Sequence, residues 1–226
     1  MKLPVFNGFR TISNPQDLAL AKFRCCPWDF YDGIKDRSPC TIGYGDILVT
    51  RTMGSGIGSV LMEQIYKRAR HKSTVLLLKT IPAKCDLIAT DDEAIYSSID
   101  RLYARLRLPG FSISRISKVL CRKRSGIIPM LDSVLQDFLY EVASKWALTN
   151  TTPVWFSKWW FGGKDTEVSP YLRMIRQDLL ANEATLREIR RILSEHTETT
   201  GVPIDAPLLR IWESIVFWHE QPKGNA

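Results

Sequence analysis

The feature that most constrains the fold is a glycine-rich turn that joins a β-type segment to a helix-type segment. Residues 46–50 read Asp-Ile-Leu-Val-Thr, and the next eight read Arg-Thr-Met-Gly-Ser-Gly-Ile-Gly. Apolar residues then recur at helical spacing, at Ile57, Val60, Leu61 and Ile65. A strand that turns through glycines into a helix presents unpaired backbone N–H groups at the positive end of a helix dipole. Such a turn favours a phosphate-binding site.

The residues after this turn predict a βαβ unit. Residues 73–81 form a short apolar run bounded by polar residues and Pro82, which is typical of a buried parallel strand. A capping-box pattern at residues 90–93 predicts the start of a helix that ends before Pro109-Gly110. Residues 111–116 then read as a further strand.

The rest of the chain predicts an opening strand and several helices. The strand is expected over 5–12, and the expected helices cover 16–24, 130–147, 169 to about 196 with a break near Asn182, and 208–218. We therefore expect an α/β domain over residues 1–118, followed by a helical region over 119–226 with a Trp-rich loop.

Three segments in order resemble the GNAT family of acetyltransferases. They are the strand and glycine turn at 46–58, the strand at 75–81, and the segment from Asp91 through Leu102-Tyr103-Ala-Arg-Leu106 to Gly110-Phe111. The resemblance covers roughly residues 41–116. It implies a mixed sheet with flanking helices, and the transfer of an acetyl group from acetyl-coenzyme A to an amine acceptor by direct attack.

The resemblance also implies which residues hold the coenzyme. Backbone groups of the glycine turn would bind the pyrophosphate, and the end of the preceding strand would face the acyl group. The residues so assigned are Val49, Thr50, Arg51, Met53, Gly54, Ser55, Gly56, Ile57 and Gly58.

Two residues are candidates for proton transfer in such a reaction. Tyr103 matches the family's tyrosine that protonates the departing thiolate, although it also lies on an apolar helical stripe and could be a core residue. Asp46 is the nearest carboxylate to the turn and a candidate general base; the alternative is a turn residue after Gly45.

Two other classes of protein remain open. The first is a non-enzymatic interaction protein, in which the glycine segment is only a tight turn. The second is a small kinase-like phosphotransferase, suggested by the glycines together with Lys79 on an apolar segment.

Two surfaces would serve an interaction protein. The basic run at 115–124 reads either as a solvated linker or as a contact for nucleic acid or an acidic protein. The aromatic residues at 155–161 read either as packing for the C-terminal helices or as a lid, a partner surface or a platform on which nucleobases stack. The C-terminal region as a whole could also form a dimer contact. Most of the formal charge of +7 lies in the first half, which suits an anionic ligand or partner.

The cysteines and the apolar runs bear on the cellular setting. The chain has five cysteines without a Cys-x-x-Cys pattern, which favours reduced thiols in the cytoplasm and gives no metal site. We expect neither a signal peptide nor a membrane span, because no apolar run approaches about 18–20 residues.

Overall fold

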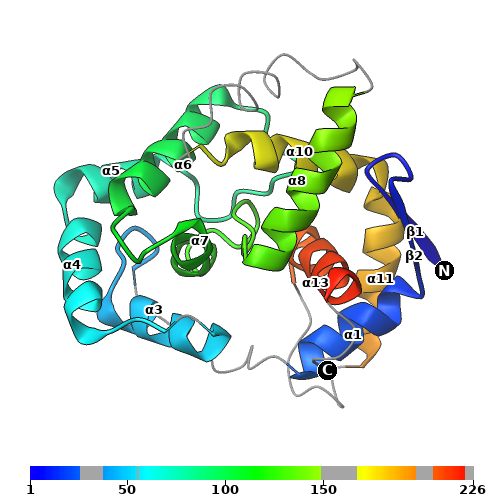
Figure 1. Cartoon of the computed structure of the whole chain (residues 1–226), viewed down its shortest axis with the longest axis horizontal. Coiled ribbons are helices and arrows are strands. Elements are labelled where there is room, and N and C mark those ends of the chain that lie inside the picture. Colours follow the sequence, from blue (N-terminus) through cyan, green and yellow to red (C-terminus); the bar gives the residue numbers. More distant parts are fainter. Residues whose placement is uncertain (26–37, 55, 149–166, 197–205, 222–226) are drawn as a thin grey trace. The chain divides into compact units, whose positions relative to one another are not determined.

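A computed structural model describes residues 1–25, 38–54, 56–148, 167–196 and 206–221 (Figure 1). Those residues are mostly helical. Within them, the strands are β1 (Lys2–Val5) and β2 (Arg10–Ser13), which pair antiparallel with Leu3 opposite Ile12. The chain divides into two compact units, and each is described by itself.

The first unit contains residues 1–26, 133–163 and 170–226. In it the strand pair is followed by α1 (Pro15–Cys25), α8 (Ser133–Leu148), α10 (Ser169–Ala181), α11 (Glu183–Glu195) and α13 (Leu208–Glu220). Helix α13 packs against α1, α8 and α11, as Figure 1 shows. Its residues from Leu208 to Val216 are all buried, so this helix supplies the centre of the core.

The second unit contains residues 27–132 and 164–169. It is built from α3 (Tyr44–Val49), the short 3-10 helix η1 (Thr50–Met53), α4 (Ser59–Ala69), α5 (Lys72–Thr80), α6 (Glu93–Leu106) and α7 (Ile113–Cys121). Helix α6 contacts α4, α5 and α7, and Figure 1 shows α7 nearly end-on among its neighbours. The buried face of α6 includes Ile99, Leu102 and Leu106, at helical spacing.

The expected GNAT-like mixed sheet is wrong. The three segments interpreted as strands at 46–50, 73–81 and 111–116 are helical: they fall in α3 and η1, in α5, and at the start of α7. The α5 segment shows why. Thr74, Leu77 and Leu78 are buried while Leu76 is 61% exposed, so the apolar run presents one helical face rather than a strand buried on both sides.

Several predicted helices are confirmed. Those expected at 16–24, 130–147 and 208–218 correspond to α1, α8 and α13. The break expected near Asn182 separates α10 from α11. The domain boundary expected after residue 118 falls inside α7, and the chain passes between the two units at residues 26–27, 132–133, 163–164 and 169–170.

Candidate functional site

A tight hairpin joins α6 to α7 across residues 107–112. Leu108 and Phe111 form an isolated β-bridge, in which the Phe111 N–H donates to the Leu108 carbonyl at 2.8 Å. Pro109 and Gly110 occupy the two central positions, and Gly110 has φ +79°. This is the pairing that a type II turn requires, because its third residue must adopt a positive φ. Pro109 and Gly110 are both exposed, so the turn projects from the surface.

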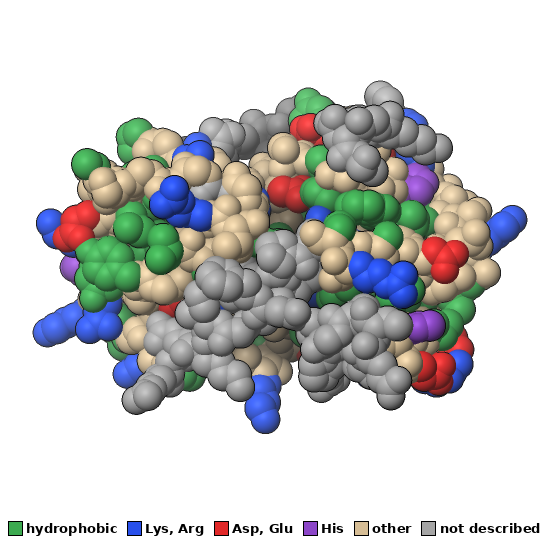
Figure 2. Space-filling view, turned by 90° about the horizontal axis from the view of Figure 1, so that it is seen from below, with side chains coloured by type: hydrophobic (Ala, Val, Ile, Leu, Met, Phe, Trp, Pro, Cys, Tyr) green, Lys and Arg blue, Asp and Glu red, His purple; other side chains and the backbone are tan. Residues whose placement is uncertain are grey.

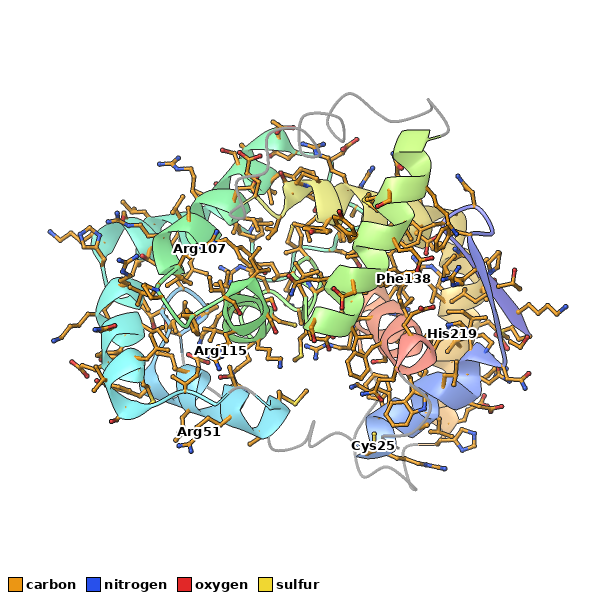
Figure 3. The ribbon with its side chains drawn as sticks, in the orientation of Figure 1. Cys25, Arg51, Arg107, Arg115, Phe138 and His219 are labelled. Atoms are coloured by element: carbon orange, nitrogen blue, oxygen red, sulfur yellow. The ribbon has the colours of Figure 1, made fainter. Side chains whose placement is uncertain are left out.

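Two arginines flank this turn. Arg107 follows the last residue of α6, and Arg115 lies in the first turn of α7, as labelled in Figure 3. The Arg115 guanidinium donates to the Gly110 carbonyl, which holds it over the turn. A depression of about 570 Å³ opens here and is lined by Arg107, Leu108, Pro109, Gly110, Phe111, Ser112 and Arg115.

The N-terminus of α7 opens into the same depression. Ser112 is the N-cap residue, and its side chain makes no capping hydrogen bond. The first N–H groups of a helix have no partner within that helix, and they carry the positive end of its dipole. We call Arg107, Ser112, Arg115 and these N–H groups the hairpin site. It is suited to an anion such as a phosphate.

A second depression, of about 430 Å³, lies where α4, α5 and α6 meet. Its lining residues are Lys67, Arg68, His71, Ala104 and Arg105. Arg68 Nη1 donates to the carbonyl oxygens of Arg105 at 3.2 Å and of Arg107 at 2.7 Å, so one side chain connects this depression to the start of the hairpin.

The basic run at 115–124, interpreted from sequence as a linker or a partner surface, points mostly into the second unit. Arg122 Nε lies 3.1 Å and Lys123 Nζ 2.8 Å from the Asp46 carboxylate, and the two cationic side chains are only 6% and 5% exposed. Lys118 Nζ donates to the Met53 carbonyl at 2.6 Å. Of this run, Arg115 is the residue that lines the hairpin depression.

Arg124 is the most deeply placed of these cations, at 1% exposed. Its guanidinium donates to the carbonyl oxygens of Leu78, of Ile81 at 2.7 Å and of Pro39 at 2.8 Å. Burial lowers the pKa of this guanidinium. Because Leu78 lies in the last turn of α5, Arg124 satisfies carbonyls that the helix end leaves without intrahelical partners.

The predicted general base, Asp46, has a structural environment. It is 1% exposed at the third position of α3, and it accepts a hydrogen bond from the Gly43 N–H at 2.9 Å. Together with Arg122 and Lys123, this forms a buried ion cluster that fixes the start of α3 against the end of α7. Val49, which the resemblance assigned to coenzyme binding, is buried at the end of the same helix.

The segment predicted to bind the coenzyme does not follow a strand, as the resemblance implied, but follows helix α3. Thr50, Arg51 and Met53 form η1, which ends at Gly54 with φ +76°. Ser55 lies outside the described residues. Ile57 is buried, and Gly58 is the N-cap of α4. An added Cβ at Gly54, Gly56 or Gly58 would meet nothing within 4 Å, so Gly54 alone needs glycine, because of its φ.

Tyr103, the predicted general acid, lies on the buried face of α6 and is 1% exposed. It shares that face with the apolar residues that hold α6 in the core, and this position corresponds to the core alternative given for it. The aromatic cluster at 155–161 lies outside the described residues.

Asp178 of α10 is a buried carboxylate of the first unit, with 3% of its surface exposed. Asp178 accepts hydrogen bonds from the Phe6 N–H, from Trp212 Nε1 at 2.6 Å and from Asn182 Nδ2 at 3.2 Å. Burial raises the pKa of Asp178 to about 6, against the opposing effect of these three donors. The group connects the β1–β2 turn to α10 and α13.

Neither a metal centre nor a membrane span is found in the part of the chain that the structure describes. No group of three or more His, Cys, Asp or Glu side chains there could hold a metal ion. None of the helices described is long and apolar enough to cross a membrane.

Comparison with known proteins gives a family without an assigned activity. Residues 16–221 match DUF6308, a family of unknown function. The chain belongs to this family. The resemblance to the GNAT acetyltransferases is therefore wrong, since the family that matches is a different one and the sheet in the described residues is only the antiparallel pair β1–β2. Searches of curated proteins and of solved structures found no match.

Sequence reasoning did not single out the hairpin site. Pro109-Gly110 was interpreted only as the end of a helix, because residues 111–116 were assigned to a strand. The overlooked signal is Ser112, an N-cap residue three positions before Arg115 and followed by apolar residues at helical spacing. An interpretation of this segment as a helix, a Pro-Gly turn and a second helix starting after Ser112 would have placed Arg107 and Arg115 on either side of one turn.

Proposed function

We propose that this protein binds the phosphate backbone of nucleic acid through the hairpin site. The observation that carries the proposal is the depression at the N-terminus of α7, flanked by Arg107 and Arg115. Backbone N–H groups at a helix start and guanidinium groups are both strong ligands for phosphate oxygens. Contacts of this kind position a protein on nucleic acid without reading its sequence.

The shape of the site favours a polymer over a small phosphate compound. The Pro109-Gly110 turn is exposed beside the depression, so the hairpin site would contact a phosphate at the protein surface. A nucleic-acid backbone offers phosphates at the surface of a groove, where a protruding turn can reach them. The net charge of +7 adds a long-range attraction for such a polyanion.

Fluorescence anisotropy with a labelled 20-base-pair duplex and with a single strand of the same length, in a salt series, tests the proposal. Arg115→Ala removes one phosphate contact, so the slope of log K against log salt is expected to become shallower by about 0.9. Arg101→Ala is the matched control, because Arg101 is an exposed arginine of α6 outside the depression. An absence of salt-dependent binding, or equal slopes for wild type and Arg115→Ala, would refute the proposal.

Acetyl-coenzyme A binding at the glycine segment stays a prediction from sequence and is tested in parallel. Calorimetric titration of wild type and Gly56→Val with acetyl-coenzyme A addresses it directly. A valine at position 56 has room in the structure, so the variant is expected to fold. Coenzyme binding that is lost in Gly56→Val would favour an acyltransferase with an amine acceptor over a nucleic-acid-binding protein.

A further inference from the structure

The depression between α4, α5 and α6, which we call the α4–α6 pocket, has a lining of one chemical kind. Lys67 and Arg68 come from the last turn of α4, His71 caps α5, and Arg105 comes from the last turn of α6. The remaining lining residue is Ala104. All four polar lining side chains are therefore basic.

The hydrogen bonds within the pocket fix the role of His71. Its Nδ1 lies 2.8 Å from Arg105 Nη2, 3.3 Å from the Ser73 backbone nitrogen and 2.8 Å from Ser73 Oγ, and the two nitrogen partners are donors. Nδ1 must then be the acceptor, which places the ring proton on Nε2. The imidazole thus offers an N–H group, as the neighbouring guanidinium and ammonium groups do.

The lining side chains consequently present donors and positive charge. Arg68 and Arg105 each carry five N–H groups. Arg68 donates to the carbonyl oxygens of Arg105 and Arg107, and Arg105 donates to His71, so these bonds use only some of the N–H groups. The acidic group beside them is Glu63, which lies 3.4 Å from Lys67 along α4 in an exposed pair. A ligand that satisfies such a lining must be an acceptor and an anion, and phosphate oxygens meet both requirements.

The α4–α6 pocket and the hairpin site both lie at the C-terminal end of α6. Arg105 and Arg107 are two residues apart, and Arg68 donates to the carbonyl oxygens of both. Phosphates bound at the two places could thus belong to one polyanion. We infer that the α4–α6 pocket binds a second phosphate of the same nucleic-acid chain, so that the second unit holds the backbone at two points. This inference rests on the proposed function of the hairpin site.

Two variants and one matched control test the inference by anisotropy with the same labelled duplex. Lys67→Ala and Arg105→Ala are each expected to make the slope of log K against log salt shallower by about 0.9, and to weaken binding about eightfold at 0.1 M salt. Lys79→Ala is the control, because Lys79 is an exposed lysine in the last turn of α5, outside the pocket, with the same helix-end position and charge as Lys67. Its slope is expected to equal that of the wild type.

The outcomes separate this inference from the proposal it rests on. If Arg115→Ala lowers the slope while Lys67→Ala and Arg105→Ala match Lys79→Ala, the hairpin site binds nucleic acid and the second phosphate site is refuted. If the wild type shows no salt-dependent binding, the proposed function itself fails.

Calorimetric titration with inorganic phosphate tests the competing ligand. Binding of inorganic phosphate that is lost in Arg105→Ala, with unchanged duplex affinity, would assign the pocket to a small phosphate compound and overturn the inference. Lys67→Glu is a second variant for the case in which Arg105→Ala fails to fold, since Lys67 is exposed and its substitution leaves the core untouched. It is expected to weaken duplex binding more than Lys67→Ala.

Discussion

Replacing Asp46 with asparagine is the sharpest test of the second unit, because it removes a carboxylate that both Arg122 and Lys123 contact. The two cations lie 3.1 Å and 2.8 Å from the carboxylate, with side chains 6% and 5% exposed. Breaking a buried ion pair by removing one partner costs about 3–5 kcal/mol, because the remaining charge stays desolvated. We expect Asp46→Asn to destabilise this unit by that amount.

Urea denaturation followed by far-ultraviolet circular dichroism measures the loss, and hydrogen exchange locates it. With a slope of about 2–3 kcal/mol per molar urea, the midpoint should fall by about 1–2.5 M. Faster exchange should be concentrated in α3 and α7, the helices that the cluster joins. Glu63→Gln is the matched control, since Glu63 forms an exposed pair with Lys67 in the same unit and should cost less than about 1 kcal/mol.

A second substitution shows whether the lost ion pairs are the cause. In Asp46→Asn/Lys123→Met one of the two buried cations is replaced by an apolar side chain of similar length, so part of the stability should return. If Asp46→Asn has the same urea midpoint as the wild type, the structural role of Asp46 is refuted, and the prediction that this carboxylate is a general base stays open.

Two further predictions concern the other buried charges. Arg124→Lys should destabilise the second unit by about 3 kcal/mol in urea titrations, because an ammonium group cannot reach the separate carbonyls of Leu78, Ile81 and Pro39 that the guanidinium bonds; a loss below about 1 kcal/mol would contradict this. The pKa of Asp178 is about 6 when folded and 3.8 as its ordinary value, so the native state holds this proton more tightly between those pH values. The contribution of Asp178 to the free energy of unfolding should then fall by about 3 kcal/mol as the pH rises from 4 to above 6. Unfolding curves of Asp178→Asn at pH 4.5 and pH 7 should lack this pH-dependent component. The same pH dependence in the wild type and in Asp178→Asn would contradict the prediction.

The helices that the sequence predicted well are those with a clear amphipathic pattern and an end signal. Helix α10 begins at Ser169-Pro170 and ends at Ala181, as a proline in the first turn and a break in the periodicity near Asn182 predict. Helix α6 begins after Asp92, two residues later than the capping box at 90–93 predicts, and the Asp92 side chain accepts a hydrogen bond from the Ala94 N–H at 2.8 Å. Local rules were enough for these helices, because the end signals and the apolar face of each helix pointed to the same segment.

The strands were predicted where short apolar runs are ambiguous. An apolar run of nine residues such as 72–80 suits a buried strand or a half-exposed helix equally, and only tertiary contacts decide between them. Once 46–50 and 73–81 were assigned to strands, the glycine segment between them acquired the appearance of a coenzyme loop. That error then carried over to the site residues.

The candidate site was harder to predict, because it depends on which basic side chains remain at the surface. The sequence shows five basic residues between 115 and 124 as one run, but it cannot show that Arg122 and Lys123 turn inward to Asp46, which lies 76 residues away from Arg122. Arg68 and His71 come close to Arg105 only through the packing of α4 and α5 against α6. No local pattern encodes those contacts.

The inward orientation of the 122–124 segment has a consequence for how fast an anionic partner is captured. The Asp46 carboxylate cancels one of the positive charges of Arg122 and Lys123, and both cationic side chains are buried, so this segment offers an arriving polyanion little exposed positive charge. The space-filling view in Figure 2 shows basic side chains on the surface as separate groups among hydrophobic ones, without a continuous basic band on that face. Diffusional encounters would consequently be guided by the exposed cations around α4, α5 and the hairpin. The loss of an exposed cation outside the two phosphate sites would therefore change the association rate more than the equilibrium affinity.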